Sequence, residues 1–205
     1  LISSTAVAVD FSTRGKEMQE LQSVLSAGSL VASGTMFPRI LLLCSIIYPP
    51  LAYKIALPLG LMGVICYASA AWLWMKDGDA KTEHDLKSGG SFELKTAFIF
   101  GALLTTIMFL SRALVAWMGD TGLYLLAAAS GLSDVDAITL SVSRMAGDQI
   151  MTDVAARAVM LAAFVNTLVK AVLASVIGGM GMARRVGATL VLAILCGAVV
   201  IFILG

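Results

Sequence analysis

Residues 122–144 read GLYLLAAASGLSDVDAITLSVSR, an apolar run long enough to cross a bilayer as a helix, for which about 20 residues suffice. Asp134 and Asp136 nevertheless lie near its middle. A charge at the bilayer centre costs from ~2.5 to more than ~10 kcal/mol unless it finds a partner or water. Carboxylates kept at that depth often mark a path for an ion, a proton or a substrate. The run therefore predicts a membrane protein with a polar site inside the bilayer.

The rest of the chain is also typical of an all-α, polytopic membrane protein. Of the 205 residues, 59% are hydrophobic, and the mean hydropathy is +0.94. A membrane barrel would show period-two alternation, which is absent. The sequence predicts six spans, at residues 21–48, 57–75, 95–119, 122–144, 153–179 and 186–204.

Leu1 to Val9 are typical of the second half of a membrane helix, without the features of a signal peptide, so we expect the natural protein to continue upstream. The net charge of +1 creates no field that attracts nucleic acid, and no nucleic-acid motif is present. Cys44, Cys66 and Cys196 have no paired spacing and are interpreted as small core side chains. No cofactor is expected.

Basic residues predict an orientation. If every span crosses, segments 13–20, 76–94 and 144–152 share one side and, with the adjoining Lys95, carry seven basic residues, against three (Lys54, Arg184 and Arg185) on the other. The positive-inside rule then makes 76–94 cytoplasmic, in a multi-pass protein of the inner membrane. Asp77, Asp79 and His84 of this loop could hold a metal, but a solvated linker is the preferred interpretation.

The chain also resembles itself at an offset of 131 residues. Eight of the 46 pairs between residues 1–46 and 132–177 are identical, and polar positions recur: Thr35 meets Asn166, and Arg39 meets Lys170. With four crossings between the copies, the sequence predicts parallel repeats. The domains would be 1–75 as the first repeat, 76–94 as the linker and 95–205 as the second repeat.

The second copy holds the main candidate site. Asp134 and Asp136 would be about 200° apart on a regular helix, so either the helix unwinds there or the two acids face different partners. Asn166 and Lys170 share one face of the next span, and Thr139 offers a neutral oxygen. Lys170 opposite one Asp would leave the other free for a cation or proton. A purely structural ion pair is the alternative. If a metal cation binds, Asp134 and Asp136 are its expected ligands.

The first copy is chemically different. Ser3, Ser4 and Thr5 replace the two acids, and Arg39 follows Pro38, which can kink its helix. Arg39 must then pair with the second copy, with Asp10 or with an anionic substrate. Hydroxyls beside a guanidinium suit an oxyanion. We therefore include these hydroxyls and Arg39 in the expected binding site.

Enzyme functions are disfavoured, because His84 lies far from any membrane nucleophile, and an aspartyl protease needs two carboxylates close together. The strings GLSDVDAITLSVSR (131–144), NTLVKA (166–171) and LISSTAVAV (1–9) resemble MgtC/SapB-type bacterial membrane proteins, in the C-terminal domain of unknown function of the longer members. The resemblance implies further upstream helices, an MgtC-like domain and an association with magnesium homeostasis.

Together, these patterns predict a transporter-like domain that moves an ion or small charged solute through a polar site at the bilayer midplane. The alternatives are a non-transporting regulator or ion sensor linked to divalent-cation homeostasis, and a scaffold whose buried pairs only fix packing. Expected partners are the lipid bilayer, the solute and the upstream part of the parent chain. Assembly into a homo-oligomer is compatible with this composition.

Overall fold

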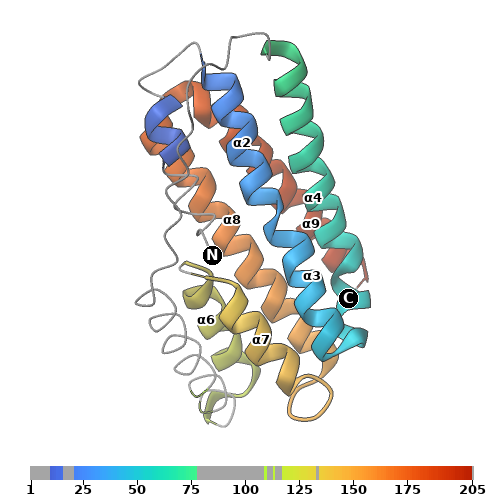
Figure 1. The fold of residues 1–205 in the computed structure, drawn as a ribbon. Helices are drawn as coiled ribbons and strands as arrows, with labels where there is room; N and C mark the ends of the chain where they lie inside the picture. Colours follow the sequence, from blue (N-terminus) through green and yellow to red (C-terminus); the bar gives the residue numbers. More distant parts are fainter. Residues whose placement is uncertain are drawn as a thin grey trace, which may run out of the picture.

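The computed structural model describes residues 10–15, 21–77, 109, 113, 117–132 and 134–204. In this part of the chain the regular elements are helices. One isolated β-bridge, between Ala146 and Ile150, lies in the turn before Thr152. The helices run along a common direction (Figure 1). The predicted all-α membrane class is thereby confirmed.

Helices α2 (Gln22–Gly34) and α3 (Met36–Ile47) follow one another down the molecule, and α4 (Pro49–Asp77) returns beside them (Figure 1). Only a turn at Thr35 separates α2 from α3. Helix α4 begins earlier than the predicted 57–75, because the first turn of a helix tolerates proline. We call the end of the molecule with the start of α2 and the end of α4 the upper end, and the opposite end the lower end.

Helix α8 (Thr152–Met182) rises through the molecule, and α9 (Ala188–Leu204) descends behind it (Figure 1). Gly179 makes the reversal possible with φ 72° and ψ −168°, and the π-helical turn Ala183–Gly187 completes it. Ser26 meets Met182 at the upper end, whereas Tyr48 meets Thr152 at the lower end. Helix α8 is therefore antiparallel to α2 and α3.

Among the described residues, three helical stretches are long and apolar enough to cross a membrane: Gln22–Ile47, Pro49–Lys76 and Thr152–Ile203. The last contains the reversal at Gly179, so it comprises the two arms α8 and α9. The predicted span 95–119 lies almost wholly outside the described residues, and 122–144 is not one continuous helix. The prediction of six spans is not confirmed.

Small side chains let α8 lie at the centre of the packing. Ala155, Ala158, Ala162 and Ala163 have no exposed surface, as expected where helix backbones approach closely. Large apolar side chains such as Phe202 of α9 are exposed on the outside, where a bilayer would cover them.

The directions of the helices change two predictions. Segments 22–47 and 153–178, which the 131-residue offset superimposes, run in opposite directions, so the expected parallel relationship is not observed. Arg184 and Arg185 lie at the upper end with Lys76, whereas residues 144–152 lie at the lower end. The assignment of 144–152 and of the two arginines to sides was therefore wrong. The domain boundaries stay a prediction.

Candidate functional site

The stretch expected as one span is two half-length helices, α6 (Asp120–Gly131) and α7 (Asp136–Met145). Between them the backbone leaves the helical path, although the Asp134 amide still donates to the Ser130 carbonyl at 2.8 Å. The first of the two alternatives for the acids is thus the observed one: the helix unwinds at the Gly131–Asp136 segment.

Helix α7 turns back on α6 rather than continuing upward. Helix α6 rises along α8 until Gly131 reaches Ala162. Helix α7 descends along α3, since Asp136 meets Arg39 and Ser143 meets Cys44 further down. The two helices form a hairpin with both ends at the lower end and its tip at mid-height (Figure 1). This hairpin moves residues 144–152 to the lower end, because the count of crossings had included it as a full span.

Two contacts with α8 hold the tip of the hairpin. A Cβ at Gly131 would lie 2.6 Å from the Ala162 carbonyl oxygen, so only glycine allows this approach. Asn166 donates from Nδ2 to the Gly131 carbonyl at 2.9 Å, and thus satisfies one of the carbonyls left unpaired at the end of α6. Ala162 and Asn166 lie about midway along the rising arm of α8, so the tip lies near the centre of the span.

Asp136 is the central acid of the site. Its Oδ2 lies 3.0 Å from Arg39 Nη2, and this pair joins α7 to α3. Asp134 supports it from the break, where its Oδ1 accepts from the Asp136 amide at 3.3 Å. Asp136 also lies in the first turn of α7, where the helix dipole favours a negative charge.

Lys170 has no exposed surface, and the polar contact of its amine is the Met36 thioether, with Nζ 3.7 Å from Sδ. Among the described residues, no carboxylate lies within ion-pair distance of it. Arg39, Asp134 and Asp136 are all within electrostatic range. The expected pair between Lys170 and an acid is therefore replaced by the pair of Arg39 with Asp136.

Among the described residues, five buried side-chain polar atoms have no hydrogen-bond partner, and three of them belong to Arg39, Asp136 and Thr139. Such atoms are rare in native proteins and often belong to functional sites. They come from the hairpin and from the α2–α3 pair of helices: Asp136 Oδ1, Thr139 Oγ1, Arg39 Nε, Ser29 Oγ and Ser33 Oγ.

The structure thus brings together the expected site residues of the second copy with Arg39. Ser3, Ser4 and Thr5 lie outside the described residues. Thr35 is exposed and donates to the Ala32 carbonyl, so it faces away from the site. Sequence reasoning missed Met36, which contacts the Lys170 amine. A methionine in an apolar helix gives no signal that distinguishes it from a core side chain.

The described part of the site carries balanced charges. Within the described part of the chain, no three His, Cys, Asp or Glu side chains gather as ligands. Asp134 and Asp136 do come close, but Arg39 and Lys170 supply as many positive charges as the acids supply negative ones. A doubly charged cation would meet their repulsion.

Comparison with known proteins identifies the family. Residues 1–178 match the family described as a domain of unknown function, DUF4010, and the chain belongs to it. The chain is 33% identical over 183 residues to an uncharacterized protein of Aquifex aeolicus (strain VF5), covering 86% of this chain and 77% of that protein. No solved structure matches. The resemblance is thus confirmed for a domain of unknown function, while the link to MgtC/SapB proteins stays a prediction.

Proposed function

We propose that this member of the DUF4010 family moves an ion or a small charged solute across a membrane, and binds it at the tip of the α6–α7 hairpin. The proposal rests on Lys170, whose amine lies in an apolar helix and has, among the described residues, the Met36 thioether as its one polar contact. Within the same part of the chain, one carboxylate oxygen of Asp136 has no hydrogen-bond partner. Unused donors and acceptors of both signs thus lie around one point.

Such an arrangement is costly unless something completes it. Burial of an ammonium without a close counter-ion costs several kcal/mol of hydration free energy. A buried carboxylate oxygen without a hydrogen-bond partner costs less, about 1–3 kcal/mol. An anion between Lys170 and Arg39 would offset the first cost. A monovalent cation or a proton on Asp136, with the Thr139 hydroxyl beside it, would offset the second. Either ligand would lower the free-energy cost of the unpaired buried charges when it binds.

In the described conformation the inner part of the site is buried, whereas the Arg39 side chain is 36% exposed. Thr139 and Lys170 have no exposed surface, and Asn166 is 3% exposed. Non-helical backbone at membrane depth is tolerated where protein buries it or where it lines a watery cavity, and interrupted helices of this kind are typical of transporters. Because both arms of the hairpin leave at the lower end, tilting the hairpin away from α3 would open the site toward that end.

The antiparallel directions of α2–α3 and α8 support an inverted repeat in place of a parallel one. The contacts of the aligned positions agree with it. Ser143 meets Cys44 of α3 at the lower end. Its aligned counterpart Ser12 lies at the upper end, with its carbonyl oxygen 3.4 Å from where a Cβ would lie on Gly178 of α8. Inverted repeats with broken helices at their interface are common in secondary transporters.

Flux assays on the full-length protein in proteoliposomes test the proposal. Monovalent cations and small oxyanions are offered separately, with Asp136→Asn and Lys170→Met as variants. We expect uptake of one solute class by the wild type and loss of at least ~90% of it in both variants, since each removes one sign of charge from the tip. Asp153→Asn is the matched control, because Asp153 pairs with Lys54 at the lower end and lies far from the tip.

The outcomes separate the three functions. Binding of a solute that raises Tm but produces no flux would favour the regulator or ion sensor. No binding and no flux, with both variants melting below the wild type, would favour the scaffold. For a partly buried pair we expect a loss of ~1–3 kcal/mol in Asp136→Asn, and a smaller loss in Asp153→Asn because solvent screens that pair.

We also propose that the protein lies in the inner membrane, with its upper end in the cytoplasm. Arg14, Lys76, Arg184 and Arg185 lie at the upper end, and Lys81 and Lys87 follow Lys76 in the sequence. The basic residues of the lower end are Lys54, Arg144 and Arg157, so the balance favours a cytoplasmic upper end. An upstream MgtC-like domain and a homo-oligomer remain proposed partners.

A further inference from the structure

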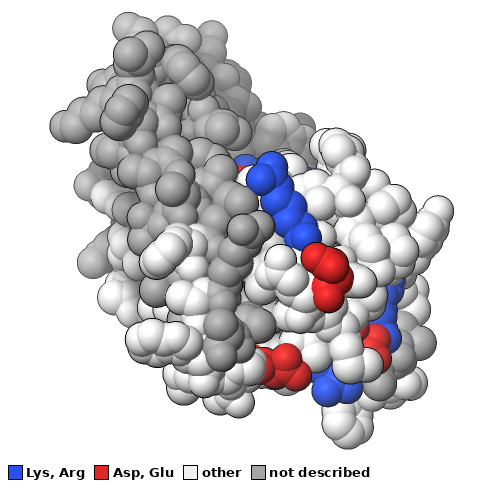
Figure 2. Space-filling model, turned by 90° about the horizontal axis from the view of Figure 1, so that it is seen from below, with Lys and Arg blue, Asp and Glu red and all other residues white. Residues whose placement is uncertain are grey.

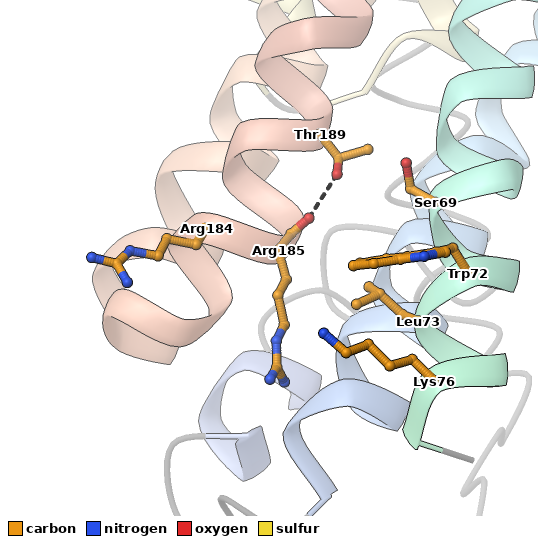
Figure 3. A pocket seen from close by; sticks show the side chains of 7 residues that line it. All are labelled: Ser69, Trp72, Leu73, Lys76, Arg184, Arg185 and Thr189. Atoms are coloured by element: carbon orange, nitrogen blue, oxygen red, sulfur yellow. Dashed lines mark hydrogen bonds between the residues drawn. The ribbon is translucent and has the colours of Figure 1, made fainter.

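A pocket of about 330 Å³ opens at the upper end, away from the hairpin, between the end of α4 and the start of α9 (Figure 3). Its charged lining residues are all basic: Lys76 from α4, and Arg184 and Arg185 from the π-helical turn. Among the described residues, none of the three is within ion-pair distance of an acid. Positive charges that converge at one pocket create a potential that attracts an anion.

The pocket holds two of these cations close together. In Figure 3 the Lys76 side chain extends toward the side chain of Arg185, which runs down past it, whereas Arg184 points away from both. The Lys76 amine lies 5.1 Å from the centroid of the Trp72 ring, which forms one wall and stabilises a cation over its face. The arginine presents its donors beside the lysine, so both can reach one anion.

The backbone of the turn sets the place of Arg185. The Thr189 hydroxyl donates to the Arg185 carbonyl at 2.7 Å and closes the turn onto α9. Gly187 lets the turn approach α8, since a Cβ there would lie 2.7 Å from Ser175 Oγ. Single turns of π-helix are frequent at functional sites. Arg185 is therefore held by the fold at the rim of the pocket.

The depth of the pocket favours a lipid. Trp72 and Trp74 near the end of α4 are 57% and 53% exposed, and tryptophans at helix ends lie at the headgroup level of a bilayer. Exposed apolar side chains of α9, Leu192 and Leu195, follow toward the middle of the membrane. The lower face differs, since its described charges are few and of both signs (Figure 2), with Lys54 paired to Asp153.

We propose that this pocket binds the phosphate of an anionic lipid headgroup, with Arg185 and Lys76 as its charged ligands and Trp72 as its wall. The Ser69 hydroxyl lies in the same lining and can donate to a phosphate oxygen. An anionic phospholipid would then hold the end of α4 to the turn before α9. Removing both cations should weaken lipid binding by about 30-fold, from the usual contribution of a basic residue near an anionic surface.

Thermal unfolding of the full-length protein in a neutral detergent tests this site. Phosphatidylglycerol, phosphatidylcholine and inorganic pyrophosphate are titrated separately, on the wild type and on Lys76→Gln/Arg185→Gln. Arg144→Gln is the control, because Arg144 is an exposed arginine of the lower end. We expect phosphatidylglycerol to raise Tm in the wild type and the control, with a midpoint about 30-fold higher in the double variant, and the difference to shrink as salt rises.

The remaining outcomes contradict the proposal in distinct ways. Stabilisation by pyrophosphate as strong as by phosphatidylglycerol would assign the pocket to a free phosphate compound in place of a lipid. Equal midpoints in the wild type and the double variant would show that the lipid acts elsewhere. Equal effects of phosphatidylcholine and phosphatidylglycerol would show that the negative charge of the headgroup is not recognised.

Discussion

At the scale of single residues, two glycines meet opposite requirements. Gly131 must leave room, because the Ala162 carbonyl oxygen occupies the position that a side chain would need. Gly179 has open space around it but adopts φ 72° and ψ −168°, a conformation that almost only glycine populates. Substitution by alanine therefore tests packing at the first and backbone conformation at the second.

Gly131→Ala should destabilise the protein by ~1–3 kcal/mol, since the added methyl group must push the tip of the hairpin away from α8. The same shift would lengthen the hydrogen bond from Asn166 to the Gly131 carbonyl. Unfolding monitored by helical circular dichroism measures the loss. Gly60→Ala is the control, because nothing lies within 4 Å of its would-be Cβ, and alanine stabilises a helix by up to ~1 kcal/mol. Equal Tm values in the two variants would contradict the close approach.

At the scale of the elements, the contribution of Gly179 to the reversal between α8 and α9 is its backbone conformation, because open space surrounds it. Gly179→Ala should therefore lower the stability by ~1–3 kcal/mol without filling any space. Hydrogen exchange should show the opening confined to the turn at residues 179–187 and the pocket beside it. If protection there is unchanged, the reversal does not require a positive φ at this position.

The sequence predicted the long helices better than the hairpin. Apolar composition and length were sufficient for α2–α3, α4, α8 and α9 to within several residues. The same criteria could not distinguish 122–144 as one crossing from two half-helices, because both bury the same side chains. The local signal was present in Gly131, Asp134 and Asp136, and it predicted unwinding as one of two alternatives. What it did not contain was the direction of α7, which depends on contacts with α3.

The candidate site was predictable in its members but not in its pairing. Asp136, Asn166 and Lys170 could be chosen because polar residues are rare at that depth. Their partners depend on tertiary contacts, and Arg39 reaches Asp136 only because α7 descends along α3. One error in direction thus changed the pairing, the sides of two loops and the relationship of the repeats.

At the scale of the whole molecule, the hairpin changes which loops share a side. In a protein free of its native cysteines, single cysteines at Lys76, Asp148 and Arg184 report this arrangement. We expect a membrane-impermeant thiol reagent on intact cells to label only Asp148→Cys, because the other two positions lie at the upper end. Permeabilised cells provide the control for reactivity. Labelling of Lys76→Cys and Asp148→Cys from the same side would contradict the hairpin.

The position of the hairpin tip also has an electrical consequence. A membrane potential falls across the low-dielectric part of the protein, and the tip lies near its middle. A charge that reaches the tip through water from the lower end would cross about half of that field on binding. The full field is worth ~2.3 kcal/mol per elementary charge for each 100 mV. A change of about 100 mV would therefore change the free energy of binding at the tip by ~1 kcal/mol per charge. Binding itself would then be voltage-dependent, before any solute had crossed.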